Sequence, residues 1–156
     1  MNRLSGSRRA DDSYRTGTRC LWYCHMLNFI YIAVGGAFGS LLRFWLGGVI
    51  DNKMGGLFPY GTLLINISGS FAIGLLAELS GPDGRVIVQS HVRNGVLIGI
   101  LGGYTTFSSF SLQTLNLVRE GEMARAGAYV LFSVALCLVG VWLGTALARY
   151  LNLRSF

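Results

Sequence analysis

Long apolar stretches alternate with short polar segments along most of the chain. A bilayer core of about 30 Å requires about 20 apolar residues in a helix, and four stretches meet this length, at residues 27–50, 54–77, 95–118 and 126–148. Only the first contains a charge, Arg43. A turn at Phe58-Pro59-Tyr60-Gly61 predicts that the second helix begins inside its stretch. The pattern predicts an all-α, multi-pass membrane protein with four transmembrane helices and both termini on one side.

Composition strengthens this prediction. Hydrophobic residues make up 52% of the 156 residues and charged residues 13%, against about 25% charged residues in an ordinary soluble domain. The low charge argues against a disordered chain, a nucleic-acid binder and a cytosolic enzyme. Many of the 22 glycines recur four residues apart, which predicts helices whose backbones approach closely; these are Gly35/Gly39, Gly95/Gly99/Gly103 and Gly140/Gly144.

The first 25 residues differ from the rest of the chain. They hold five arginines and two aspartates, which accounts for half of the net charge of +6, and they show no hydrophobic periodicity. We expect residues 1–25 to be a disordered basic extension, with Met26 as an alternative start of the folded unit and residues 26–154 as the four-helix domain.

Basic residues near the ends of the spans are almost balanced between the two sides. The side with the termini carries Arg85, Arg93, Arg149 and Arg154, and the other carries Lys53, Arg119 and Arg125, with Arg43 as a possible fourth. A chain without charge bias is expected to insert both ways up, which predicts an antiparallel, dual-topology homodimer. The arginines of residues 1–25 disturb this balance, so either the extension is absent from the working protein or the chain prefers one orientation.

The third span contains the most unusual sequence, GGYTTFSSFS at residues 102–111. Paired glycines followed by threonines are poor helix formers, and a broken helix at mid-membrane depth would offer carbonyl oxygens to a small cation. The alternative is a continuous helix with a small-residue packing face whose hydroxyls bond to the preceding turn.

Each polar or aromatic residue inside the spans has two interpretations. The amide of Asn66 either donates to an anion or bridges two helices. Phe107 and Phe110, three residues apart, either pack in the core or present the positive edges of their rings to an anion. Arg43 either extends to the interface or raises the potential of an anion vestibule. Further hydroxyls lie on one face of the fourth span, at Tyr129 and Ser133.

Three segments together resemble the Fluc (CrcB-type) family of fluoride channels. They are GGAFGSLLRF at 35–44, GTLLINISGSF at 61–71 and the 102–111 segment, and the resemblance covers about residues 26–151. It implies a dual-topology homodimer in the inner or plasma membrane, with two pores for passive fluoride efflux and a structural sodium ion at the dimer centre. The implied sodium ligands are the backbone carbonyls of Gly102 and Thr105.

The resemblance also assigns roles to individual side chains. Asn66 matches an amide that donates to the anion, Phe107 and Phe110 match a pair of rings whose edges face fluoride, and Arg43 matches a vestibule arginine. Polar pore groups are implied at Ser109, Tyr129 and Ser133. Two residues depart from the family pattern, since Gln113 stands where an acidic residue is frequent and Cys137 stands where a hydroxyl is expected.

Other functional classes explain the sequence less well. A small dual-topology multidrug or cation exchanger would need a carboxylate inside a span, whereas Asp51 and Glu78 lie at span ends. A purely structural assembly protein would not require the hydroxyl-rich run around Phe107 and Phe110. The three cysteines do not form a disulfide framework, and no phosphate-binding loop, nucleophile–base pair or metal-ligand cluster is apparent.

Overall fold

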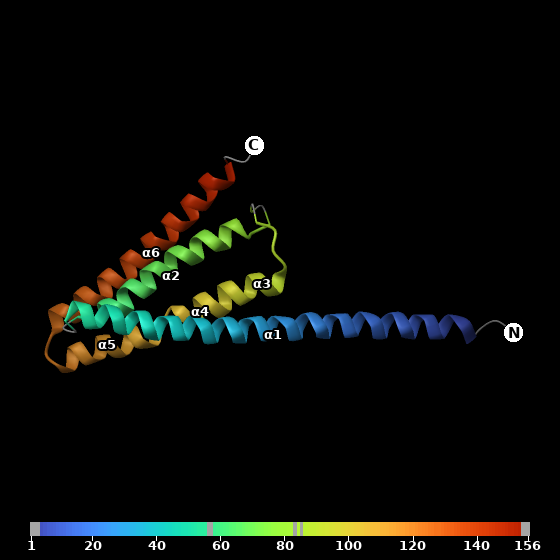
Figure 1. Ribbon diagram of the computed structural model, residues 1–156, viewed down its shortest axis with the longest axis horizontal. Coiled ribbons are helices and arrows are strands. Elements are labelled where there is room, and N and C mark those ends of the chain that lie inside the picture. The colour runs from blue at the N-terminus through green and yellow to red at the C-terminus, as the bar shows by residue number, and fades with distance from the viewer. Residues whose placement is uncertain (1–3, 56–57, 83, 85, 154–156) are drawn as a thin grey trace.

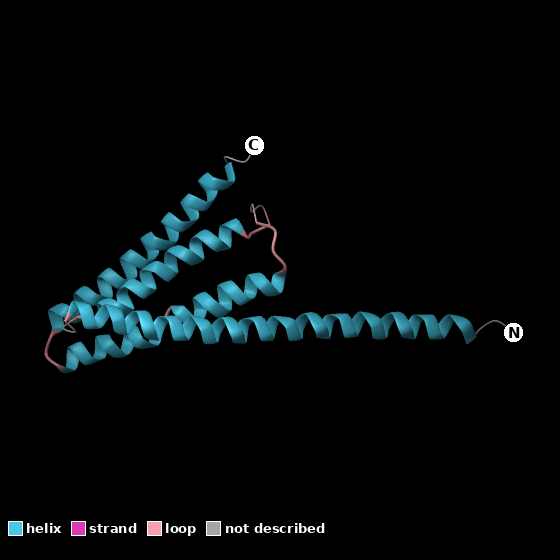
Figure 2. Ribbon diagram, in the orientation of Figure 1, coloured by secondary structure: helices cyan, strands magenta, loops and turns pink. Residues whose placement is uncertain are grey.

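All regular structure that can be described in this chain is helical (Figure 2). The computed structural model describes residues 4–55, 58–82, 84 and 86–153, with side chains described from His25 onward. In chain order the elements are α1 (Leu4–Met54), α2 (Tyr60–Leu79), α3 (Ser90–Asn94), the π-helix η1 (Gly95–Leu101), α4 (Gly102–Tyr104), α5 (Phe107–Arg119) and α6 (Met123–Leu153).

Four helical stretches are long and apolar enough to cross a membrane. They are His25–Met54, Tyr60–Leu79, Ser90–Arg119 and Met123–Leu153. The prediction of an all-helical chain with four candidate spans is therefore confirmed. The predicted turn also occurs where expected, because Pro59 is the residue that precedes the first turn of α2.

The N-terminal extension differs from its expectation in one respect. α1 begins at Leu4, so the backbone is helical through most of the region where irregular chain was expected. Adding a residue to an existing helix gains one hydrogen bond without a new nucleation cost, and both prolines lie beyond residue 58. Among the residues with described side chains, the candidate span of α1 is His25–Met54. The division into an extension and a channel domain stays a prediction, and its boundary at residue 154 lies outside the described residues.

The helices are arranged as two pairs (Figure 1). α2 lies along α6, and α1 lies along η1 and α4. The pairs meet where α5 turns into α6 and diverge toward the other end, where the C-terminus of the chain and the long N-terminal part of α1 lie. Both termini therefore point toward the same end, as four antiparallel spans require.

Glycines set the close approach within each pair. A Cβ at Gly35 would collide with the carbonyl oxygen of Gly95, and a Cβ at Gly39 would collide with that of Ile100. In the other pair, a Cβ at Gly144 would collide with the carbonyl oxygen of Phe71. The predicted glycine packing faces are thus confirmed, and they bring backbone against backbone.

The third candidate span is not one continuous α-helix. α4 ends at Tyr104 and α5 begins at Phe107, and the two threonines between them are extended, with φ/ψ of −80°/155° at Thr105 and −150°/115° at Thr106. Two β-branched residues after two glycines favour this local geometry. The interruption lies beside α2, and this position creates the site described next.

Caps and turns fix the other helix ends. The carboxylate of Asp51, at the end of α1, accepts a hydrogen bond of 2.8 Å from the backbone N–H of Gly61 in the first turn of α2, where Pro59 supplies no side-chain cap. Glycines in the left-handed region follow α1 at Gly55 (φ 79°) and follow α5 at Gly121 (φ 80°), where other residues would be strained.

Candidate functional site

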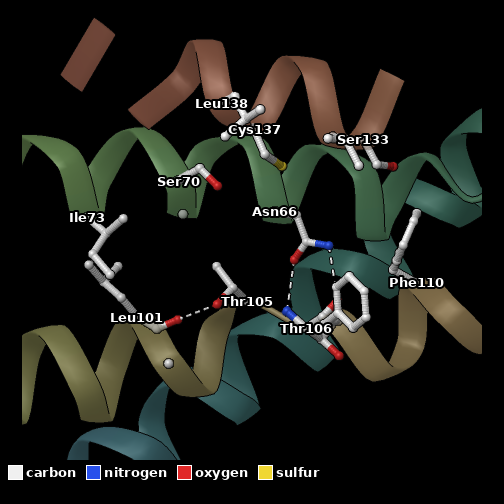
Figure 3. A pocket seen from close by; sticks show the side chains of 14 residues that line it. Asn66, Ser70, Ile73, Leu101, Thr105, Thr106, Phe110, Ser133, Cys137 and Leu138 are labelled. Atoms are coloured by element: carbon white, nitrogen blue, oxygen red, sulfur yellow. Dashed lines mark hydrogen bonds between the residues drawn. The ribbon is translucent and has the colours of Figure 1, made fainter. Parts of the chain in front are cut away.

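A cavity of about 360 Å³ lies where the interrupted third span faces α2 and α6 (Figure 3). It gathers residues from three elements that are distant in sequence. Six of the nine candidate site residues line it, namely Asn66, Gly102, Thr105, Phe107, Phe110 and Ser133. Ser109, Tyr129 and Arg43 lie outside its described lining.

Asn66 is bonded at both ends of its carboxamide to a single residue. Its Nδ2 donates to the carbonyl oxygen of Thr106 at 3.0 Å, and its Oδ1 accepts from the N–H of Thr106 at 2.8 Å (Figure 3). The side chain thus pairs with the extended backbone as a neighbouring strand would. An amide nitrogen carries two hydrogens, so one N–H of Asn66 remains beyond this pair. Bridging and anion donation are therefore compatible roles for the same residue.

The hydroxyl of Thr106 caps α5. Its Oγ1 accepts from the N–H of Ser109 at 3.2 Å and donates to the Oγ of Ser109 at 3.0 Å. A threonine before the first helical residue that accepts from the third is a standard N-cap arrangement. The hydroxyl of Ser109 is thus engaged in this cap, which places it at the base of the interruption, outside the cavity lining.

These contacts redirect two N–H groups that a continuous helix would use. In an α-helix each N–H donates to the carbonyl four residues earlier. The N–H of Thr106 would then donate to the carbonyl of Gly102, and the N–H of Ser109 to the carbonyl of Thr105. Here the N–H of Thr106 donates to Oδ1 of Asn66, and the N–H of Ser109 donates to the hydroxyl of Thr106. The carbonyls of Gly102 and Thr105 lose these donors, and oxygen atoms of this kind are ligands for hard cations.

The two phenylalanines differ in burial although they touch. Their ring centroids are 5.3 Å apart with the planes tilted by 49°. Phe110 is 8% exposed and packs in the core, whereas Phe107 is 78% exposed. A large aromatic side chain that lines a cavity and also faces outward needs a further surface to cover it.

Four residues of α6 complete the cavity wall, and two of them, Ser133 and Cys137, carry polar groups. Ser133 is buried at 6% exposure, and its Oγ has no hydrogen-bond partner among the described residues. One turn later the thiol of Cys137 points into the cavity (Figure 3). A buried hydroxyl without a partner is costly, so Ser133 is a natural donor to a ligand.

Tyr129 connects this cavity to a second one. It is fully buried, its ring packs on Phe110 at 5.2 Å and on Phe58 at 5.4 Å, and its hydroxyl donates to Oε1 of Gln113 at 2.9 Å. Phe58 and Gln113 also line the second cavity, of about 640 Å³, whose rim carries the charged residues Asp51, Glu120, Glu122 and Arg125. A line of aromatic and polar groups thus joins the two cavities.

Metal ligation by side chains has no support in the described part of the chain. No group of three or more His, Cys, Asp or Glu residues is close enough there to hold a metal ion. Any cation at the interruption would therefore be held by backbone and hydroxyl oxygens. Arg43 is half-buried on α1, and its predicted vestibule role stays a prediction.

The sequence did not reveal Thr106 as the centre of the site. The spacing from Thr106 to Ser109 is a recognisable cap signal, but the partner of its backbone lies 40 residues earlier. Only the packing of α2 against the interruption brings these two positions together.

Comparison with known proteins identifies the family. The family described as "CrcB-like protein, Camphor Resistance (CrcB)" matches residues 30–145. This match covers well over half of the chain. The chain belongs to the CrcB family. The matched region contains every candidate site residue, and the resemblance that the sequence motifs indicated is confirmed.

Individual relatives are similar over nearly their whole length. A protein named fluoride-specific ion channel FluC from Methylocella silvestris is 51% identical over 126 residues, which are 81% of this chain and 96% of the relative. Proteins of the same name from Rhodospirillum rubrum and Opitutus terrae are 53% and 54% identical, over 98% and 94% of their lengths. The names of these relatives thus state the ion that they conduct, which is fluoride.

Proposed function

We propose that this protein is a fluoride-selective channel that allows passive fluoride efflux and so keeps cytoplasmic fluoride low. The observation that carries the proposal is the cavity at the interrupted span, where Asn66, Ser133 and the Phe107/Phe110 pair meet in a member of the CrcB family. The relatives' name supports the choice of ion. Family membership also agrees with the prediction that the chain is not an enzyme.

The chemistry of the cavity suits a small, strongly hydrated anion. The remaining N–H of Asn66 and the hydroxyl of Ser133 can replace water in the shell of the ion. The ring edges of Phe107 and Phe110 offer weaker positive contacts. Conduction requires binding that is firm enough to admit the ion and weak enough to release it, and this lining contains no fixed positive charge that would trap the anion.

Anion efflux from liposomes that contain the purified protein tests this function. We expect rapid fluoride efflux with negligible chloride efflux, and loss of fluoride efflux in F107I. The matched control is F132I, because Phe132 is a half-exposed α6 residue outside the described cavity lining. Unchanged fluoride efflux in F107I would contradict the assignment of the pore.

We further propose that the working unit is an antiparallel, dual-topology homodimer with two pores at its interface. The near balance of Lys and Arg between the two sides supports dual insertion. The outward-facing ring of Phe107, at 78% exposure, supports a second copy that completes each pore. Cysteine crosslinks that form only between parallel copies would contradict this arrangement.

We also propose that a structural sodium ion binds at the centre of the dimer. The interruption of the third span would then lie at mid-membrane depth. The carbonyls of Gly102 and Thr105 would hold the ion, and the support for this is that both lose their helical N–H donors here. Bound sodium would supply positive charge that keeps the broken helices together. Replacing sodium by a large organic cation should lower the thermal stability of the dimer.

A multidrug or cation exchanger remains the runner-up from a different class. Such a transporter couples its substrate to protons through a carboxylate in the membrane. The described lining of the cavity at the interruption carries no Asp or Glu. We therefore expect no proton-driven export of cationic dyes in vesicles.

The surroundings proposed for the channel are the lipids of a bacterial inner membrane. Four candidate spans and family membership make this a multi-pass membrane protein. α1 and α6 carry large exposed apolar side chains outside the cavity lining, among them Phe29, Phe44, Leu131 and Trp142. Acyl chains or the second copy would cover them.

A further inference from the structure

The contact between Asn66 and Thr106 affects more than one site. Thr106 is buried, at 7% exposure, so its N–H needs a partner inside the protein. The nearest helical partner would be the carbonyl of Gly102, four residues earlier. The structure instead gives that N–H to Oδ1 of Asn66, at 2.8 Å.

The hydrogen bond from Thr106 to Asn66 affects whether the carbonyl oxygen of Gly102 is free to bind another partner. A carbonyl oxygen that accepts a helical N–H is turned along the helix and is partly neutralised by that bond. Because Asn66 takes the Thr106 N–H, the Gly102 oxygen keeps its lone pairs for another partner. The N-cap of α5 has the same effect on Thr105, whose helical donor, Ser109 N–H, goes to the Thr106 hydroxyl.

We propose that Asn66 is a positioning residue for the cation site as well as a donor to the anion. Its Oδ1 accepts from the Thr106 N–H, which leaves the carbonyl oxygen of Gly102 available to bind sodium. Its second amide hydrogen donates to fluoride in the pore. One carboxamide thereby links the two ions. The inference rests on the proposed function, because it takes the sodium ion as the ligand of Gly102 and Thr105.

Two substitutions at Asn66 separate the two roles. In N66D one carboxyl oxygen still accepts from the Thr106 N–H, and the other, when protonated, donates to the Thr106 carbonyl in place of Nδ2. No hydrogen is then left for the anion. In N66L no acceptor is left on the side chain, and the carbonyl of Gly102, reached by closing the helical turn, is then the nearest acceptor in the protein for the Thr106 N–H. The positioning role thus depends on the acceptor and the conducting role on the donor.

The first readout is sodium-dependent stabilisation of the full chain in detergent, titrated with sodium chloride against N-methylglucamine chloride. We expect wild type and N66D to show similar half-saturating sodium concentrations and N66L to need at least about tenfold more sodium, a coupling of ordinary size. The second readout is fluoride efflux from liposomes, which should be lost in both variants.

F107I is the matched control, because Phe107 makes no contact with the Thr106 N–H in the described hydrogen bonds. It should lose fluoride efflux and keep the wild-type sodium response. If N66L does not fold, N66S serves in its place, since its hydroxyl is one bond shorter and falls short of the Thr106 N–H.

The outcomes distinguish the two proposals. A wild-type sodium response in N66L or N66S would overturn the positioning role, as would loss of that response in N66D. A wild-type protein without any sodium response would overturn the sodium site itself, and the positioning role with it. Fluoride efflux by the wild type would leave the channel function standing in either case.

Discussion

Ser133 places a buried hydroxyl in the cavity wall without a partner among the described residues. The unfolded chain would hydrogen-bond this group to water, so its burial costs free energy. A ligand that accepts its hydrogen would recover that cost. The pore role proposed for Ser133 thus comes at the expense of stability.

Replacement of this serine by alanine should separate stability from conduction. We expect S133A to unfold within about 0.5 kcal/mol of wild type, or to be more stable, because no described bond is lost. Fluoride efflux from liposomes should fall by about tenfold, since one charge-assisted donor of about 1.5 kcal/mol or more is removed. S80A is the control, because the Ser80 hydroxyl donates to the Leu76 carbonyl, accepts from Arg93 and lies outside the cavity. A stable S133A with normal efflux would remove Ser133 from the pore.

Cys137 lies one turn further along the same wall, where a thiol replaces the hydroxyl that the family pattern leads one to expect. A thiol donates more weakly than a hydroxyl. We expect C137S to raise fluoride efflux about two- to tenfold, the effect of one hydrogen bond of ordinary strength, and C137A to give no increase. Equal efflux in all three proteins would show that the ion does not contact this position.

The third span owes its shape to contacts made by other elements. α2 supplies Asn66 for the extended backbone at Thr106, and α1 provides the glycine surface against which η1 and α4 lie. Without these contacts, a continuous helix would satisfy the same N–H groups. The interruption therefore depends on the packing of the bundle as well as on the local preference of the two threonines for an extended backbone.

The glycine surface of α1 offers a direct test at this scale. In G39A the new Cβ would collide with the Ile100 carbonyl and lie 2.9 Å from Tyr104 N, just before the interruption. We expect a loss of about 1–3 kcal/mol, the usual cost of overpacking, visible as a lower thermal unfolding midpoint. G48A is the matched control on the same helix, because its Cβ would meet nothing within 4 Å. Equal unfolding midpoints for the two variants would contradict the close packing of α1 on the third span.

At the scale of the whole molecule, the charge distribution decides orientation. Residues 1–25 add five arginines to a side that otherwise carries about as many basic residues as the opposite side. We expect the full chain to insert mainly with its termini in the cytoplasm, and a chain that starts at Met26 to insert both ways in about equal amounts.

Accessibility of a single cysteine placed at Asn52 measures the two orientations. Asn52 lies at the end of α1 remote from the termini, so an impermeant reagent reports which way each copy points. The cysteine-free parent, with its three native cysteines replaced by serine, is the control. Identical labelling of the full and shortened chains would show that the extension has no influence on orientation.

The sequence by itself determined the number of candidate spans, the approximate ends of most of them and several of the residues that line the cavity. Spans follow from length and hydropathy, because a bilayer imposes both. The glycine faces follow from spacing alone. Asn66 stood out as the carboxamide of the second span, and the family resemblance assigned pore roles to Asn66, Phe107, Phe110 and Ser133. The structure brings all four to one cavity.

Only the tertiary structure decided how these residues work together. The sequence left open whether the third span is continuous and whether Asn66 bridges helices or serves an anion. The interruption of the span and the bridging by Asn66 both depend on a contact between positions 40 residues apart, and local propensity carries no information about such pairs. The physical reason is that a buried N–H takes the best acceptor within reach. Which acceptor is within reach at Thr106 is set by the packing of α2 against the third span.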